Sequence, residues 1–332
     1  MSWGAAMVAS LLVILPRPAT WIVALAAFLV RGGLLLFVLP IVVLPSPVGL
    51  ANIVGPTLTA FWLGGMSLGF AAIVAGIFAV FFLWLIVGGW VAAVTERDLI
   101  ELVAHDDELT GIGAPAHRTS RRRRGRVSRI VLLRLAGHLP LAVALGYGSL
   151  RIVEATYREL TLPSDVLTPI AWRVIGSAPD AVLAIAIAWS LGEILGSLGA
   201  RRLVLWGQSI DRAYIGAWAD LLRRPTTTLA TFLAPAAVLA AVAGPIVLAA
   251  GLAWDAVRVG LADRGADDGV AVLGTLLAFV AVWSAGLLIA GLAAAWRSAA
   301  WTVEVMRGRG TFGAPGPHRP GEWSDPHPSG SL

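Results

Sequence analysis

The sequence predicts an all-α, polytopic membrane helix bundle with about six transmembrane helices, arranged as three hairpins that each follow a short interfacial helix. Two observations support this fold class. Of the 332 residues, 58% are hydrophobic and only 14% are charged, whereas a soluble domain carries about 25% charged residues. Six apolar stretches also approach the roughly 20 residues that a helix needs to cross a bilayer. They lie at residues 20–44, 66–94, 130–150, 178–200, 227–254 and 270–296.

Helices are the expected form of these spans. Lipid offers no hydrogen-bond partners to the backbone, and the alternating ten-residue pattern of a membrane β-barrel does not occur. The third span is the least well defined. Its segment "RIVLLRLAGHLPLAVALGYGSLRIVEATYREL" contains Arg134, His138 and Pro140. The membrane helix could therefore begin near Leu139 instead and continue past Arg151.

The N-terminal residues predict an interfacial helix. The segment "AAMVASLLVIL" is too short to span a bilayer, and Pro16 and Pro18 follow it closely. A basic n-region and a small-residue cleavage site are both missing, so we do not expect a cleaved signal peptide. The integral membrane domain is expected to cover residues 1–305. The tail at 306–332 is rich in proline, glycine and serine and is expected to be disordered.

The distribution of arginine predicts the orientation of the bundle. The 95–129 connection contains eight arginines and the 201–225 connection five, whereas 151–177 contains three and 255–269 two. Because cytoplasmic loops carry the excess of basic residues, both termini and the two arginine-rich connections are expected in the cytoplasm. An even number of spans requires this shared side. The predicted location is the cell membrane.

A loose internal repeat divides the chain into three units. The segments "SLLVILPRPAT", "VLLRLAGHLPL" and "DLLRRPTTTL" each place a leucine pair shortly before a proline that opens a long apolar run. Chance similarity in a leucine-rich chain is the alternative. An interfacial helix, a proline elbow and a membrane hairpin, repeated three times over residues 5–305, resemble the six-helix membrane domain of some bacterial glycerophosphodiesterases and its uncharacterised stand-alone relatives. The resemblance implies the membrane fold and not the phosphodiesterase activity, because no soluble catalytic domain remains outside the spans.

Arg31 lies near the middle of the apolar segment "WIVALAAFLVRGGLLLFVLP". An arginine at the bilayer centre costs about 2.5–3.5 kcal/mol on insertion scales, so its charge should face the bundle interior. The helix rise places Arg31, His138 and Glu193 at a similar depth in the cytoplasmic half. These three residues are the predicted buried polar site. It could bind an anion or a substrate carboxylate, or it could be an Arg31–Glu193 ion pair with His138 hydrogen-bonded at a bend before Pro140.

The strongest surface feature is the basic segment "HRTSRRRRGRVSR", which is expected to contact anionic lipid headgroups. The predicted contact residues are Arg121, Arg122, Arg123, Arg124 and Arg126. Nucleic acid is not an expected partner, because no aromatic residues interrupt the basic run. The nearby acidic segment contains Glu101, His105, Asp106, Asp107 and Glu108. Consecutive acidic residues on a helix point in different directions, so we predict no metal site and no cofactor.

Three classes of function remain open. Neither an H-E-x-x-H motif nor a Ser/His arrangement occurs, so an enzyme is not expected. A non-catalytic membrane scaffold, partner or lipid-organising protein needs only the features above and is the preferred prediction, with a membrane-protein partner left open. The alternative is a transporter or permease that uses Arg31, Glu193 and the helix breaks at Pro235 and Gly244–Pro245.

Overall fold

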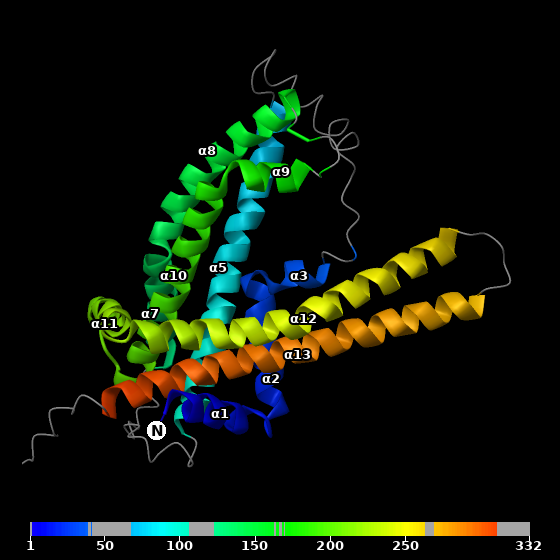
Figure 1. Cartoon of the computed structure of the whole chain (residues 1–332). Helices are drawn as coiled ribbons and strands as arrows, with labels where there is room; N and C mark the ends of the chain where they lie inside the picture. Colours follow the sequence, from blue (N-terminus) through cyan, green and yellow to red (C-terminus); the bar gives the residue numbers. More distant parts are fainter. Residues whose placement is uncertain are drawn as a thin grey trace, which may run out of the picture.

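The structure, a computed structural model, describes residues 2–38, 41, 68–105, 123–162, 164–165, 168, 170–262 and 269–310. Helices make up almost all of this part of the chain, and no strand occurs in it (Figure 1). The predicted all-α class is confirmed. The tail beyond Gly310 lies outside the described residues, and the last helix continues to Gly310, past the predicted domain end at 305.

Along the chain, the helices can be grouped into three consecutive units. The first unit contains α1 (Trp3–Ile14), α2 (Pro18–Phe28), the π-helical segment η1 (Leu29–Gly33), α3 (Leu34–Val38) and α5 (Leu68–Ala104). The second contains α7 (Arg123–Gly137), α8 (Leu139–Thr161), α9 (Ile170–Ser177) and α10 (Pro179–Trp206). The third contains α11 (Ile210–Arg223), α12 (Pro225–Ala262) and α13 (Gly269–Gly310).

In each unit, a proline lies in the first turn of the helix that follows the short first helix. Pro18 and Pro225 are the first residues of α2 and α12, and Pro140 lies in the first turn of α8. Proline fits the first turn of a helix, because the N–H that it lacks has no intrahelical partner there. The short helix before each proline and the apolar helices after it therefore occur three times.

Four helices are long and apolar enough to cross a membrane, and up to six spans result if each of two bent helix pairs counts as one. The four are Ala71–Ala104, Pro179–Trp206, Pro225–Leu261 and Gly269–Gly308. The bent pairs are Trp3–Ile14 with Pro18–Gly33, at 105°, and Val127–Gly137 with Leu139–Glu159, at 42°. In the second pair the straight apolar helix begins at Leu139, which agrees with the alternative limits of the third span.

Two arms diverge from a common base in Figure 1. The hairpin of α12 and α13 forms one arm, and α5, α8 and α10 form the other. The short helices α1, α7 and α11 lie at the base, where the two arms meet, and α2 and α3 lie where the arms separate. The broken helix formed by α2, η1 and α3 therefore lies at the branch point of the molecule.

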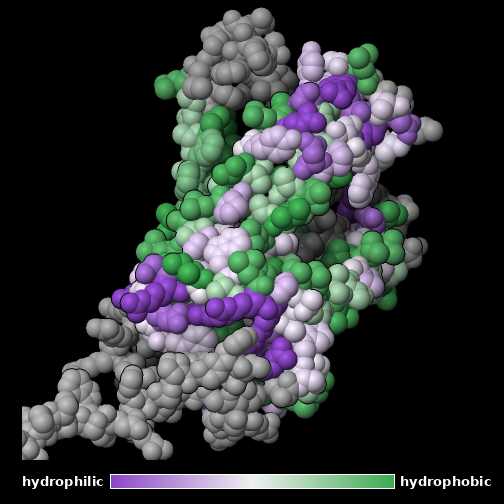
Figure 2. Space-filling view, turned by 60° about the vertical axis from the view of Figure 1, so that its left-hand side comes forward, coloured by the Kyte–Doolittle hydropathy of each residue, from purple (hydrophilic) through white to green (hydrophobic). Residues whose placement is uncertain are grey.

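Burial changes at one level along three helices. On α5, large apolar side chains are exposed as far as Trp90, whereas Ala92 and the apolar residues after it, through Val103, are mostly buried. On α10, Trp189 is the last exposed apolar residue before a continuously buried run that begins at Gly192. On α13, the corresponding change follows Leu288. Figure 2 shows a broad hydrophobic zone between hydrophilic patches at the two ends of the visible face.

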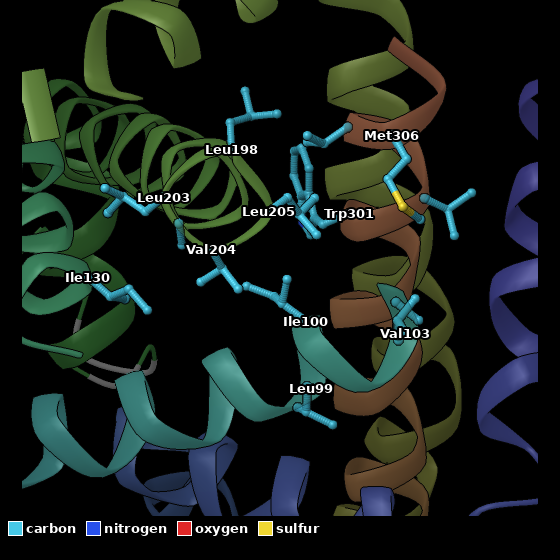
Figure 3. Close-up of a cluster of buried hydrophobic side chains, with 14 of the residues drawn as sticks. Leu99, Ile100, Val103, Ile130, Leu198, Leu203, Val204, Leu205, Trp301 and Met306 are labelled. Atoms are coloured by element: carbon cyan, nitrogen blue, oxygen red, sulfur yellow. The ribbon is translucent and has the colours of Figure 1, made fainter. Parts of the chain in front are cut away.

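The buried ends of the helices form the hydrophobic core of the base. Figure 3 shows side chains from α5, α7, α10 and α13 meeting there. The labelled members are Leu99, Ile100, Val103, Ile130, Leu198, Leu203, Val204, Leu205, Trp301 and Met306. The arms therefore present apolar surface, while the base is packed like the interior of a soluble domain.

Candidate functional site

Glu96 is the centre of a charged network at the top of the base. Arg134 binds its carboxylate side-on, with Nε 2.7 Å from Oε2 and Nη2 2.6 Å from Oε1. Arg31 donates from Nη2 to Oε2 at 2.8 Å, and Arg201 donates from Nη1 to Oε1 at 2.8 Å. Bidentate arginine–carboxylate pairs are among the strongest polar contacts in proteins, so Glu96 ties η1, α5, α7 and α10 together.

Glu193 is the second carboxylate of the network. Arg297 donates from Nη2 to its Oε2 at 2.7 Å, and Arg134 Nη1 lies 3.5 Å from its Oε1. His138 Nε2 is 3.6 Å from the same Oε1. Arg134 therefore bridges the two carboxylates and joins both halves of the network through one guanidinium.

Arg201 is the most deeply buried member, with a side chain that is 2% exposed. It donates to the carbonyl oxygen of Ser197 at 2.9 Å, and to both the carbonyl oxygen and the hydroxyl of Ser298 at 3.1 Å. Its Nε has no hydrogen-bond partner within the part of the chain that the structure describes. Arg297 also lies over the ring of Phe232, with 5.6 Å between its guanidinium carbon and the ring centroid, which adds a cation–π contact to α12.

Arg31 reaches the network from a break in the first span. It lies within η1, and the next residue, Gly32, has φ of 106°, a backbone conformation that favours glycine. Val30 packs against Gly88 so closely that a Cβ added there would meet its Cγ1 at 2.6 Å. Arg31 thus joins the bundle at the level of Gly88, about 12 Å along α5 from Glu96 by the helix rise. Its long side chain extends from the apolar arm to the base.

The three predicted site residues belong to one network, although the predicted pairing is wrong. Arg31 pairs with Glu96, and Glu193 pairs with Arg297 and Arg134, so Arg31 and Glu193 lie in one network without forming an ion pair with each other. His138 lies where it was expected, at the bend before α8. Its Nδ1 is 2.8 Å from the carbonyl oxygen of Arg134.

Sequence reasoning missed four members: Glu96, Arg134, Arg201 and Arg297. Glu96, Arg201 and Arg297 lie just beyond the ends of predicted spans, where a charged residue is ordinarily assigned to a solvated loop. Arg134 lies within the third predicted span, and nothing in the sequence indicated that it pairs with a carboxylate. The signal that could have found Glu96 is the continuation of a helical pattern past residue 94. The helix α5 in fact extends to Ala104, which carries Glu96 into the packed base.

The network contains four arginines and two glutamates, so its arginines and glutamates together carry two more positive than negative charges. Guanidinium N–H donors also outnumber the carboxylate oxygens, because each arginine has five donors and no acceptor. Such an arrangement can hold helices in register and can attract an anion.

The predicted lipid-contact residues are described only in part. Arg121 and Arg122 lie outside the described residues, and Arg123, Arg124 and Arg126 lie in the first turns of α7, where the backbone alone is described. In the acidic segment, His105 Nδ1 is 2.6 Å from the carbonyl oxygen of Glu101. Residues 106–108 lie outside the described chain. Within the part described, no group of three or more metal-ligating side chains is found.

A second polar cluster lies at the far end of α8 and α10. Glu154 pairs with Arg151 at 2.7 Å and with Arg158 at 3.3 Å, and Arg151 also reaches Asp180 on α10 at 3.2 Å. The first two pairs join residues three and four positions apart on α8, which lie on the same face of a helix. The buried Glu159 was not anticipated. It accepts hydrogen bonds from Arg173 Nη1, Ser177 Oγ and both the N–H and hydroxyl of Ser164.

Comparison with known proteins finds no match to this chain. No protein-family model matches the sequence, and neither the curated proteins nor the solved structures contain a significant match.

Proposed function

We propose that this chain is an integral protein of the cell membrane, with six spans and both termini in the cytoplasm, and that it acts without catalysis as a scaffold that organises lipid around its base. The change in burial along α5, α10 and α13 carries the proposal. Monomeric soluble proteins rarely expose contiguous apolar patches larger than a few hundred Å². Lipid would cover the exposed side chains of the arms.

The charges at the base support the orientation. Arg97, Arg129, Arg212 and Arg223 all lie on helices that end or pack there. Excess arginine on one side of the spans marks the cytoplasmic side. The base would then lie at the cytoplasmic headgroup level, where arginines attract anionic lipids at about 1 kcal/mol each.

The side chains of the network support a structural role over a catalytic one. Both carboxylates are engaged by arginines, which joins η1, α5, α7, α10 and α13 in one hydrogen-bonded unit. A general base or nucleophile would need a free lone pair directed at a substrate. The repeated short helix, proline and hairpin also support the likeness to the membrane domain of bacterial glycerophosphodiesterases, for the fold alone.

Fractionation and labelling test membrane insertion and orientation. The chain should stay in the membrane pellet at alkaline pH and dissolve in detergent. Because the native chain has no cysteine, single cysteines can be introduced directly. Leu162→Cys, at the far end of α8, should react with an impermeant thiol reagent in intact cells. Ser209→Cys, at the base before α11, should react only after permeabilisation, and the reverse pattern would contradict the proposed orientation.

Lipid co-purification tests the organising role. Replacing Arg121, Arg122, Arg123 and Arg124 with glutamine should reduce the anionic phospholipid that co-purifies with the chain, and the difference should shrink as salt screens the charges. Arg158→Gln is the matched control, because this arginine is 61% exposed at the opposite end of α8. Equal lipid content in all three proteins would argue against the lipid-organising role.

One observation favours a transporter as the second candidate. The first span breaks at Arg31, and α12 contains Pro235 and Pro245; broken helices line the sites of many transporters. Leu34, 38% exposed in the turn after Arg31, is the test position. Rapid reaction of Leu34→Cys with small charged thiol reagents would indicate an aqueous path and favour transport. Protection from these reagents would favour the scaffold.

A further inference from the structure

The charges of the network do not balance among the residues that the structure describes. In that part of the chain, Arg31, Arg134, Arg201 and Arg297 face only two carboxylates, those of Glu96 and Glu193. The other titratable group beside them is the imidazole of His138. Unbalanced charge at the edge of an apolar region is unfavourable. A ligand of opposite charge would remove the imbalance.

The network also has hydrogen-bond donors to spare. Among the described residues, the buried Nε of Arg201 has no acceptor. Within the same part of the chain, Arg31 donates one hydrogen bond, from Nη2 to Glu96, and Arg297 donates one, from Nη2 to Glu193. Since a guanidinium carries five N–H groups, most donors of these two side chains remain available to a further acceptor.

The two arginines with spare donors are also the accessible ones. The side chains of Arg31 and Arg297 are 32% and 30% exposed, whereas those of Arg134 and Arg201 are 12% and 2% exposed. Arg31 comes from the broken helix between α2 and α3, where the arms separate in Figure 1. Arg297 contacts Glu193 on α10 and Phe232 on α12, and so lies between the two arms.

We propose that the network is a binding site for a phosphate group, with Arg31 and Arg297 as the binding cations and Arg134 and Arg201 as the buried charges behind them. The planar fork of arginine matches the oxygens of a phosphate. One phosphate monoester dianion, or two diester anions, would neutralise the excess charge. The phosphate could belong to a phospholipid headgroup or to a soluble anion. The lipid source rests on the proposed membrane insertion, and the soluble source does not.

Thermal unfolding of the purified full-length chain in non-ionic detergent tests this site. The melting temperature is measured with inorganic phosphate, with sodium chloride at equal ionic strength, and with micelles containing short-chain phosphatidylglycerol or phosphatidylcholine. We expect inorganic phosphate or phosphatidylglycerol to raise the melting temperature above its chloride or phosphatidylcholine control. Arg31→Gln and Arg297→Gln should each weaken the apparent affinity by roughly tenfold or more, as expected for one charge-assisted hydrogen bond.

The variants should remain folded, because each carboxylate keeps a partner. Without Arg31, Glu96 still binds Arg134 and Arg201, and without Arg297, Glu193 still has Arg134. Arg31→Lys retains the charge and should recover part of the shift. Arg158→Gln, at the opposite end of α8, should keep the full shift.

The outcomes separate the two sources. A shift with inorganic phosphate identifies a site open to soluble anions, and a shift with phosphatidylglycerol alone identifies a headgroup site. No shift with either ligand, or an undiminished shift in both Arg31→Gln and Arg297→Gln, would overturn the proposal. Membrane fractionation and cysteine labelling give independent results, so loss of the phosphate site would leave the membrane proposal standing, and the reverse is also true.

Discussion

Glu96 holds together more of the base than any other charged residue of the network, because three arginines from three different segments converge on its two oxygens. Glu96→Gln keeps the shape of the side chain but leaves these arginines without a counter-charge. Breaking a buried ion pair by removing one partner costs about 3–5 kcal/mol. We therefore expect a large loss of unfolding free energy, measured by chemical denaturation in detergent.

Glu193→Gln is the matched comparison for that change. It also removes a carboxylate, but its partner Arg297 is 30% exposed, and Arg134 keeps its bidentate contact with Glu96. The loss of unfolding free energy should be clearly smaller than for Glu96→Gln. Equal losses in the two variants would show that Glu96 is not the centre of the network.

Double-mutant cycles distinguish the observed pairing from the one that the sequence suggested. Arg31 lies 2.8 Å from Glu96, so Arg31→Gln and Glu96→Gln should couple within the 0.5–3 kcal/mol that is typical of residues in contact. Arg31→Gln and Glu193→Gln should couple more weakly, because these two residues form no ion pair with each other. The readout is the unfolding free energy in detergent. Stronger coupling to Glu193 than to Glu96 would contradict the described geometry.

The sequence predicted that Arg31 must find a partner, but not which one. The cost of a charge in lipid follows from composition and span length, and that argument led to Arg31, His138 and Glu193. The choice of partner depends on how far the side chain of Arg31 extends and on how α5 packs against η1. Neither is a local property of the sequence, so Glu96 was left in a predicted loop.

At the level of helices, Gly291 permits the closest approach between α13 and α2. A Cβ at Gly291 would lie 2.6 Å from the carbonyl oxygen of Trp21 and 3.1 Å from Cβ of Leu25. Because the nearest atom belongs to the backbone, Gly291→Ala should push the helices apart and destabilise the chain by about 1–3 kcal/mol. The melting temperature in detergent measures the effect.

Gly274→Ala is the control for this substitution on the same helix. A Cβ at Gly274 would meet nothing within 4 Å, and alanine is favoured over glycine inside a helix by about 1 kcal/mol. This variant should be neutral or slightly stabilised. If Gly291→Ala behaved like Gly274→Ala, the close packing of α2 on α13 would be in doubt.

The buried Glu159 should hold α9 against the ends of α8 and α10. Its side chain is 4% exposed and pairs with Arg173 of α9 at 3.1 Å. Glu159→Gln should raise amide hydrogen exchange in α9 and leave the base unchanged. Glu154→Gln is the control, because Glu154 is 54% exposed and exposed ion pairs contribute little, about 0–1 kcal/mol. Unchanged exchange in α9 would exclude the anchoring role.

The sequence predicted the order and type of the helices better than their ends. Hydropathy marks the part of a helix that suits lipid, and the predicted ends at 94 and 296 coincide roughly with the change in burial. The helices α5 and α13 continue to Ala104 and Gly310 because their charged turns find partners in the base. Such continuation depends on tertiary packing, which the hydropathy pattern of the sequence does not reveal.

On the scale of the whole molecule, the base and the arms follow different physical rules. The base buries its side chains against one another, as a soluble domain does, whereas the arms leave theirs exposed. The high mean hydropathy of +0.80 predicted the arms. It did not predict the base, because the base is assembled from helix ends and short helices that are far apart in sequence. It also did not predict that the arms diverge (Figure 1).

The common level at which burial changes predicts where the molecule lies in a bilayer. Val87, Ile187 and Leu288 are 52%, 59% and 56% exposed just on the arm side of this level, on three different helices. If the base lies at the headgroup region, spin labels on cysteines at these three positions should report one shallow depth. The measurement is the relative accessibility of each label to oxygen and to a polar nickel complex.

Labels further along the arms should be deeper. Ile77 and Leu277 are 66% and 61% exposed, and the helix rise places them about 15 Å from Val87 and Leu288 respectively. That distance is close to half of the roughly 30 Å hydrocarbon core, so both labels should report the bilayer centre, even though they belong to different arms. A label at Leu277 as shallow as one at Leu288 would mean that the hairpin of α12 and α13 lies along the membrane surface. The chain would then have fewer than six spans, and only one of the two arms of the V-shaped molecule would cross the bilayer.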